Sequence, residues 1–76
     1  MKLSEFRRAV VDEFGDAYGR SLVRDLVLGD VGDRTAQQAL DAGVAPRDVW
    51  LALCAATDVP RERWHGAGRP QPRPGQ

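Results

Sequence analysis

Two side chains in the sequence, Cys54 and His65, are of the types that bind soft metal ions or serve in nucleophilic catalysis. A structural zinc site takes four ligands, so one cysteine and one histidine cannot complete it. A nucleophilic cysteine needs a nearby base and a lowered pKa, whereas Cys54 lies in an apolar segment with no base close to it. We therefore expect Cys54 to be a small core residue and His65 a solvated tail residue, with no metal ion and no cofactor.

Adjacent carboxylates are a second arrangement with catalytic potential, and Asp12 and Glu13 form such a pair. Paired carboxylates do acid–base work only when a cleft holds them, and a domain this small has little room for one. The four-residue spacing of Arg8 and Asp12, and of Asp16 and Arg20, predicts solvated ion pairs on helix faces instead. No constellation of polar residues predicts a catalytic pocket, so we expect the protein not to be an enzyme.

The segment "ALDAGVAPRDVW" has the spacing of a helix-turn-helix. Its small contact residue, its turn glycine and its apolar anchor are Ala39, Gly43 and Val49. The second helix, however, offers DNA only Arg47 for reading bases, and Asp48 beside it repels phosphate. Binding of nucleic acid through Arg34, Arg47 and the tail arginines is therefore the alternative hypothesis rather than the first one.

The charge of the chain also argues against nucleic acid as a partner, and its composition predicts the number of domains and the compartment. Residues 1–64 carry nine Lys or Arg against eleven Asp or Glu, a net charge of −2, which does not provide the positive field that phosphate binding needs. A length of 76 residues with 42% hydrophobic composition predicts one small domain. The single cysteine, together with an N-terminus unlike a signal peptide and no long apolar run, favours the cytoplasm.

The apolar spacing predicts four helices and a final helical turn. Their expected ranges are 4–14, 16–28, 35–42, 46–57 and 60–64. Ser4 and Asp16 are the expected caps of the first two helices, and Thr35 with Gln38 forms a capping box for the third. Gly19 weakens the start of the second helix, which makes Ser21 the alternative first residue.

These elements predict an all-α fold, a small orthogonal four-helix bundle with one C-terminal helical turn and a helix-turn-helix-like corner. The domain is expected to span residues 1–65, and the Gly- and Pro-rich residues 66–76 to form a disordered tail. The helix over 46–57 is apolar around most of its circumference. It is therefore either the central helix or a helix with one side turned to a partner.

Two tryptophans are considered as parts of the core and of a protein-binding surface. Trp50 lies on the broad apolar face and is expected mainly in the core, whereas Trp64 suits a core role and a binding role equally well. We expect a non-enzymatic module for protein–protein contacts. Its predicted contact surface comprises Arg47, Leu51 and Trp64, with Trp50 at the edge.

Several stretches resemble a family of short actinobacterial proteins classed as a domain of unknown function. They are "LSEF", "FGDAY", "RDLVL" and above all "RTAQQALDAGVAPRDVWLALCAATDVPRERW", so the resemblance covers about residues 1–64. It implies a small, cytoplasmic, helical protein. It also implies genes that lie beside those of the recombinase A strand-exchange protein and its recombination regulator, and hence a protein partner in DNA recombination or repair. It implies no catalytic residues.

Overall fold

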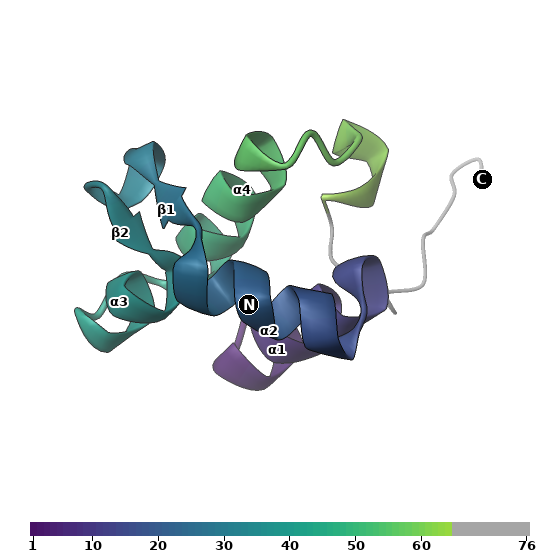
Figure 1. The fold of residues 1–76 in the computed structure, drawn as a ribbon, viewed down its shortest axis with the longest axis horizontal. Helices are drawn as coiled ribbons and strands as arrows, with labels where there is room; N and C mark the ends of the chain where they lie inside the picture. The colour runs from purple at the N-terminus through teal and green to yellow at the C-terminus, as the bar shows by residue number, and fades with distance from the viewer. Residues whose placement is uncertain (65–76) are drawn as a thin grey trace.

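The structure, a computed structural model, describes residues 1–64 and is mostly helical (Figure 1). Its α-helices are α1 (Leu3–Phe14), α2 (Asp16–Asp25), α3 (Ala36–Asp41) and α4 (Pro46–Ala56). Two-residue strands β1 (Val27–Leu28) and β2 (Arg34–Thr35) and 3₁₀ turns η1 (Gly29–Val31) and η2 (Arg61–Arg63) complete it. The predicted helices and final turn are thus present, whereas His65, the end of the predicted domain at residue 65 and the predicted tail 66–76 lie outside the described residues.

The small antiparallel sheet corrects the all-α prediction. The second helix ends at Asp25 rather than residue 28, and Leu26 is already extended. Val27 then pairs with Thr35, and Leu28 with Arg34. An apolar run this short fits a helix or a strand equally well, and strands of two residues are too short to show alternation. The pairing with residues six and eight positions away decides the conformation.

The start of α1 also differs from the prediction. The residue at the N-cap is Lys2, not Ser4, and its backbone N–H donates a 2.6 Å hydrogen bond to Glu5 Oε1. Gly15, between α1 and α2, has a φ of 87°, which favours glycine. The residue at the N-cap of α2 is Gly15, not Asp16 as predicted, and Asp16 is the first residue of the helix. Gly19 therefore lies within α2 and is buried against α1.

The α3–α4 corner forms as the sequence predicts. Gln38 N–H donates to Thr35 Oγ1 at 3.1 Å, and Thr35 N–H donates to Gln38 Oε1 at 3.0 Å, which completes the capping box. Gly43 turns the chain with a φ of 95°. Ala39 and Val49 are fully buried where the two helices meet.

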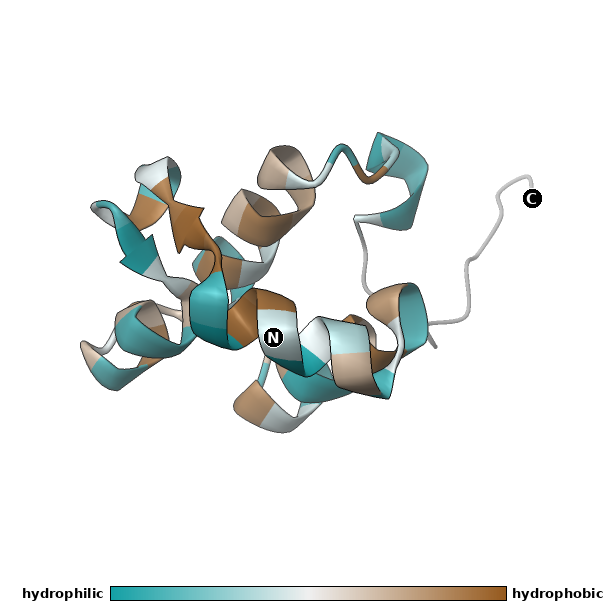
Figure 2. Cartoon of the chain, viewed as in Figure 1, coloured by the Kyte–Doolittle hydropathy of each residue, from teal (hydrophilic) through white to brown (hydrophobic). Residues whose placement is uncertain are grey.

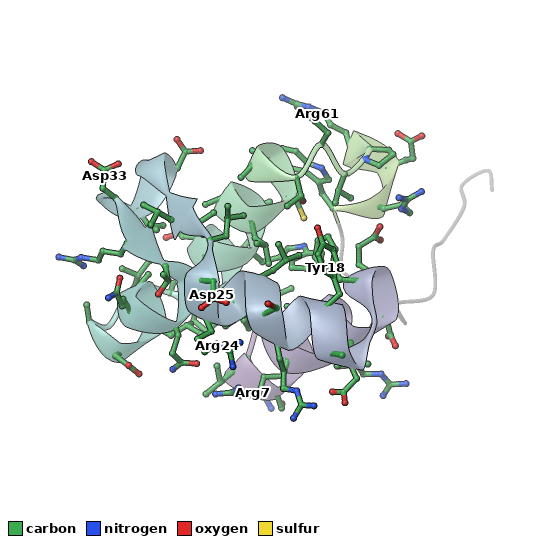
Figure 3. The ribbon with its side chains drawn as sticks, in the orientation of Figure 1. Arg7, Tyr18, Arg24, Asp25, Asp33 and Arg61 are labelled. Atoms are coloured by element: carbon green, nitrogen blue, oxygen red, sulfur yellow. The ribbon has the colours of Figure 1, made fainter. Side chains whose placement is uncertain are left out.

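The core is centred on α4, which contacts α1, α3, β1 and η1. Its buried residues are Val49, Trp50, Ala52, Leu53 and Cys54. The hydrophobic colouring of α4 and β1 in Figure 2 shows this layer, and charged side chains such as Arg7, Asp33 and Arg61 project outward (Figure 3). The prediction that this helix is central is therefore confirmed.

Tyr18 lies one helical turn before Leu22 but does not pack against the core as Leu22 does. Tyr18 is 61% exposed and makes an edge contact with Phe14, with ring centroids 6.3 Å apart. Since α2 is short and lies against α1 at Gly19, its first turn is left outside the packed region.

Candidate interaction groove

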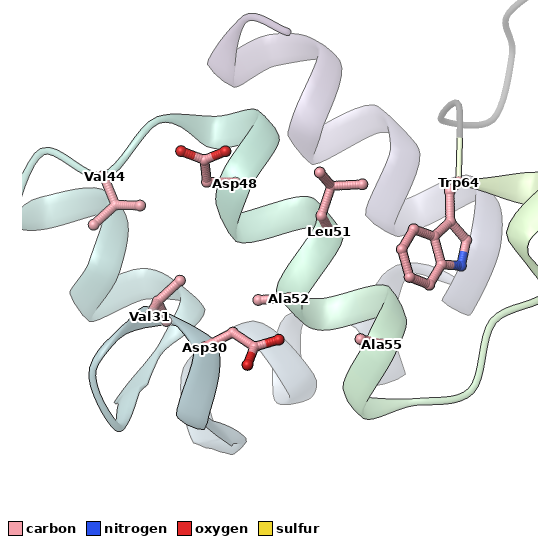
Figure 4. Close-up of a pocket in the computed structure, with 8 residues that line it drawn as sticks. All are labelled: Asp30, Val31, Val44, Asp48, Leu51, Ala52, Ala55 and Trp64. Carbon is pink, nitrogen blue, oxygen red and sulfur yellow. The ribbon is translucent and has the colours of Figure 1, made fainter.

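A groove of about 470 Å³ runs along the outer side of α4 (Figure 4). Four of its lining residues come from α4, two from η1, one from the α3–α4 turn, and one from the end of η2. They are Asp30, Val31, Val44, Asp48, Leu51, Ala52, Ala55 and Trp64. Apolar side chains thus form most of the surface, with two carboxylates among them.

The groove is hollow because small residues of α4 form its floor. Asp48, Leu51, Ala52 and Ala55 recur at steps of three and four, which places them on one side of the helix. Ala52 and Ala55 add almost no volume, and the larger Leu51 and Trp64 stand beside them (Figure 4). The depth of the groove therefore follows from alternating small and large residues on one helix face.

Trp64 is fixed at one end of the groove by two hydrogen bonds. Its indole Nε1 donates to Val59 O at 2.6 Å, and its own carbonyl accepts from Trp50 Nε1 at 2.8 Å. The Arg61 guanidinium lies 5.2 Å from the centre of the Trp64 ring, a cation–π contact. Trp64 is thus half-buried, serving both as core packing and as groove wall.

Trp50, in contrast, lies beneath the surface with only 1% of its area exposed. Its ring makes edge contacts with Phe6 and Phe14, at centroid distances of 6.4 and 6.3 Å. The predicted core role of Trp50 is confirmed. Its placement at the edge of the contact surface is wrong, because α1 covers the side of α4 on which Trp50 lies.

An ion pair between distant parts of the chain holds the end of η2. Arg63 Nη2 donates to Glu13 Oε2 at 2.8 Å and Arg63 Nε donates to Glu13 Oε1 at 3.1 Å. The hydrogen bond and the charge of Glu13 raise the pKa of Arg63 above its ordinary value. Glu13 is thus engaged by Arg63, and its neighbour Asp12 lies 3.7 Å from Arg8, so both carboxylates of this adjacent pair have basic partners. The predicted ion pairs of Arg8 with Asp12 and of Asp16 with Arg20 are both present.

The thiol of Cys54 is fully buried within α4. Burial, and secondarily the charge of Glu13, raises the pKa of Cys54 from 9.0 to about 12. A thiol with so high a pKa is protonated at neutral pH and is a poor nucleophile. The expected role of Cys54 as a small core residue agrees with this environment.

This burial predicts slow chemistry at Cys54 and a specific pH dependence of stability. An aromatic disulfide reagent at pH 8 is expected to modify the Cys54 thiol of the native protein only as fast as the protein unfolds. The same reagent is expected to modify Cys54 of the denatured protein immediately. Because the pKa is raised in the folded state, the stabilising contribution of the neutral thiol is complete below pH 9 and is lost between pH 9 and 12. Rapid modification of the native protein would contradict the buried placement.

The predicted binding residues are only partly brought together. Leu51 and Trp64 both line the groove, whereas Arg47 is exposed on the first turn of α4 outside its lining. Arg34 is exposed on β2. The sequence did not single out Asp30, Val31 or Val44, and no local pattern signals them, because the hairpin and the corner bring them to α4.

Within residues 1–64, no group of three or more His, Cys, Asp or Glu side chains is arranged to hold a metal ion. No helix in that part of the chain has the length and apolar character needed to cross a bilayer.

Comparison with known proteins gives one result that covers most of the chain. No curated protein and no solved structure matches it. A family model with the description "Protein of unknown function (DUF3046)" matches residues 1–62, which include α1 to α4 and most of η2. This match confirms the resemblance to a domain of unknown function, and the chain belongs to the DUF3046 family.

Proposed function

We propose that this protein is a non-enzymatic module that binds a protein partner through the groove along α4. The observation that carries the proposal is the open, mostly apolar groove on a helix whose opposite side is packed into the core. A helix held in this way presents its outer side in one fixed geometry. Less ordering is then needed on binding, which favours affinity.

The resemblance described above suggests which partners to test first. It implies actinobacterial genes that often lie beside those of the recombinase A protein and its recombination regulator, so we propose a cytoplasmic partner in DNA recombination. Leu51 and Trp64 are the predicted anchors, since large half-buried side chains commonly dominate binding energy at interfaces. Support for this partner comes from gene neighbourhood, and support for the surface comes from the geometry of the groove.

Two alanines of α4 provide a matched test of the groove. Ala55 lines it, whereas its neighbour Ala56 is exposed on the same helix outside it. We expect Ala55→Gln to weaken binding of recombinase A or its regulator at least tenfold, because the longer side chain fills the groove. Ala56→Gln is expected to leave binding unchanged, with titration calorimetry as the measurement. Equal binding by both variants, or binding of neither protein to the unaltered chain, would contradict the proposal.

Nucleic acid is the less favoured partner, because Arg47 has an acidic sequence neighbour and the described residues are acidic overall. Asp48 adjoins it in sequence and the described residues carry a net charge of −2. We expect no shift of DNA or RNA in a mobility-shift titration at low salt with micromolar protein. A shift that weakens steeply as salt rises would instead reveal phosphate contacts and favour this alternative.

A further inference from the structure

Resting on the proposed function, we propose that the groove selects an amphipathic helix that carries Lys or Arg beside its apolar stripe. Two features of the groove support this partner. They are the two carboxylates on its walls and the helical, alanine-floored shape of its base.

The carboxylates of Asp30 and Asp48 come from separate elements, η1 and α4, and meet at one groove. Within residues 1–64 neither makes an ion pair or a hydrogen bond through its side chain. Elsewhere in that part of the chain, Asp12, Glu13 and Asp16 each lie beside an arginine, whereas the exposed Asp33 and Asp58 do not. Asp48 and Asp30 both occupy first-turn positions, in α4 and η1, but this does not account for two such carboxylates lining one groove.

The apolar surroundings strengthen the attraction between those carboxylates and a cationic partner. Val31 and Val44 lie next to the two aspartates, and Leu51 lies one helical turn beyond Asp48 (Figure 4). A helix seated here would exclude water from around its basic groups. Charge-assisted hydrogen bonds are stronger in such a partly desolvated site than on an open surface.

The shape of the groove favours a helix over an extended peptide. Ala52 and Ala55 on its floor allow a second helix axis to approach α4 closely. None of the lining residues belongs to β1 or β2, so the groove offers no strand edge for pairing. Apolar anchors spaced by three and four residues would contact Leu51 and Trp64 in turn.

Charge also sets the direction of the partner. Asp30 and Asp48 lie toward the η1 end, and Trp64 closes the other end with Arg61 against its ring (Figure 4). The basic residues of the partner are therefore expected near the aspartates and away from Arg61. Its bulky apolar residue is expected near Trp64.

Two synthetic peptides test this inference on the full chain. Both are eighteen residues long with leucines at helical spacing and alanine elsewhere, and they differ only in having lysines or glutamates beside the leucines. Fluorescence anisotropy of labelled peptide is the measurement. We expect the lysine peptide to bind, to bind more weakly as salt rises, and to outbind the glutamate peptide at least tenfold.

Variants separate the charge inference from the groove itself. The double variant Asp30→Asn with Asp48→Asn is expected to weaken the lysine peptide about threefold to tenfold. Asp33→Asn is the control, since Asp33 is exposed and lies outside the groove lining. No loss in the double variant, or equal binding of the two peptides, would overturn the charge inference.

The variant Ala55→Gln then distinguishes failure of the charge inference from failure of the proposed groove. If it abolishes binding of both peptides while the aspartate variants have no effect, the groove binds partners but charge does not select them. If neither peptide binds, or if binding survives Ala55→Gln, both the inference and the proposed surface fail. A concentration-dependent dimer that Ala55→Gln abolishes would identify a second copy as the occupant, and would also overturn the inference.

Discussion

Replacing Trp50 with alanine is expected to unfold the domain at room temperature. The indole is 1% exposed and packs edge-on against Phe6 and Phe14, so its removal leaves a large cavity between α4 and α1. Truncation of a buried tryptophan costs about 3–5 kcal/mol of unfolding free energy. A domain of this size has a net stability of only a few kcal/mol, so the loss is comparable to the total.

The same substitution also frees the end of η2. Trp50 Nε1 donates to Trp64 O at 2.8 Å, and without this bond the carbonyl loses its partner in the core. Trp50→Phe keeps a ring but removes the donor, so it isolates this bond from most of the packing. We expect Trp50→Phe to retain a cooperative transition at a lower melting temperature, and Trp50→Ala to show none. Circular dichroism melts give both results, and a melt of Trp50→Ala within a few degrees of the unaltered protein would contradict them.

Gly19→Ala is expected to destabilise the protein, although helix propensity alone predicts the opposite. A Cβ at this position would lie 2.6 Å from Val10 Cγ1 and 3.2 Å from Val10 O. Val10 is buried and β-branched, so neither its side chain nor its backbone moves away easily. The resulting strain costs about 1–3 kcal/mol, which at least offsets the ~1 kcal/mol that alanine gains over glycine within a helix.

Two further variants test the cause of this effect. Gly29→Ala is the control, since its nearest contact would be an ordinary 3.7 Å to Asp33 Oδ1, and we expect a change within about 0.5 kcal/mol. Val10→Ala is expected to cost less in the presence of Gly19→Ala than alone, because it removes the clash. Urea denaturation of the unaltered chain, Gly19→Ala, Val10→Ala and the double variant gives the coupling free energy between the two positions. A higher midpoint for Gly19→Ala than for the unaltered chain would show that α1 and α2 are farther apart than described.

Local sequence signals were sufficient for the features that depend on neighbouring residues. The capping box of Thr35 and Gln38, the positive φ of Gly43 and the proline at the start of α4 each involve interactions within a few residues. The all-round apolarity of α4 also favoured its central place, and Leu51, which was predicted for the contact surface, lies in the groove lining. Trp64 suited a core role and a binding role equally well, and in the structure it packs against the core and lines the groove.

Tertiary structure alone decided the β1–β2 hairpin and the position of the groove. The groove joins Asp30 and Val31 of η1 to α4 and Trp64 through the folded chain, and no sequence periodicity spans that separation. Gly19 is a second example, because its lack of a side chain matters only where Val10 of α1 packs against it. Short-range hydrogen bonding and hydrophobic spacing therefore determined which segments became helices, whereas contacts between distant segments determined which surfaces were left exposed.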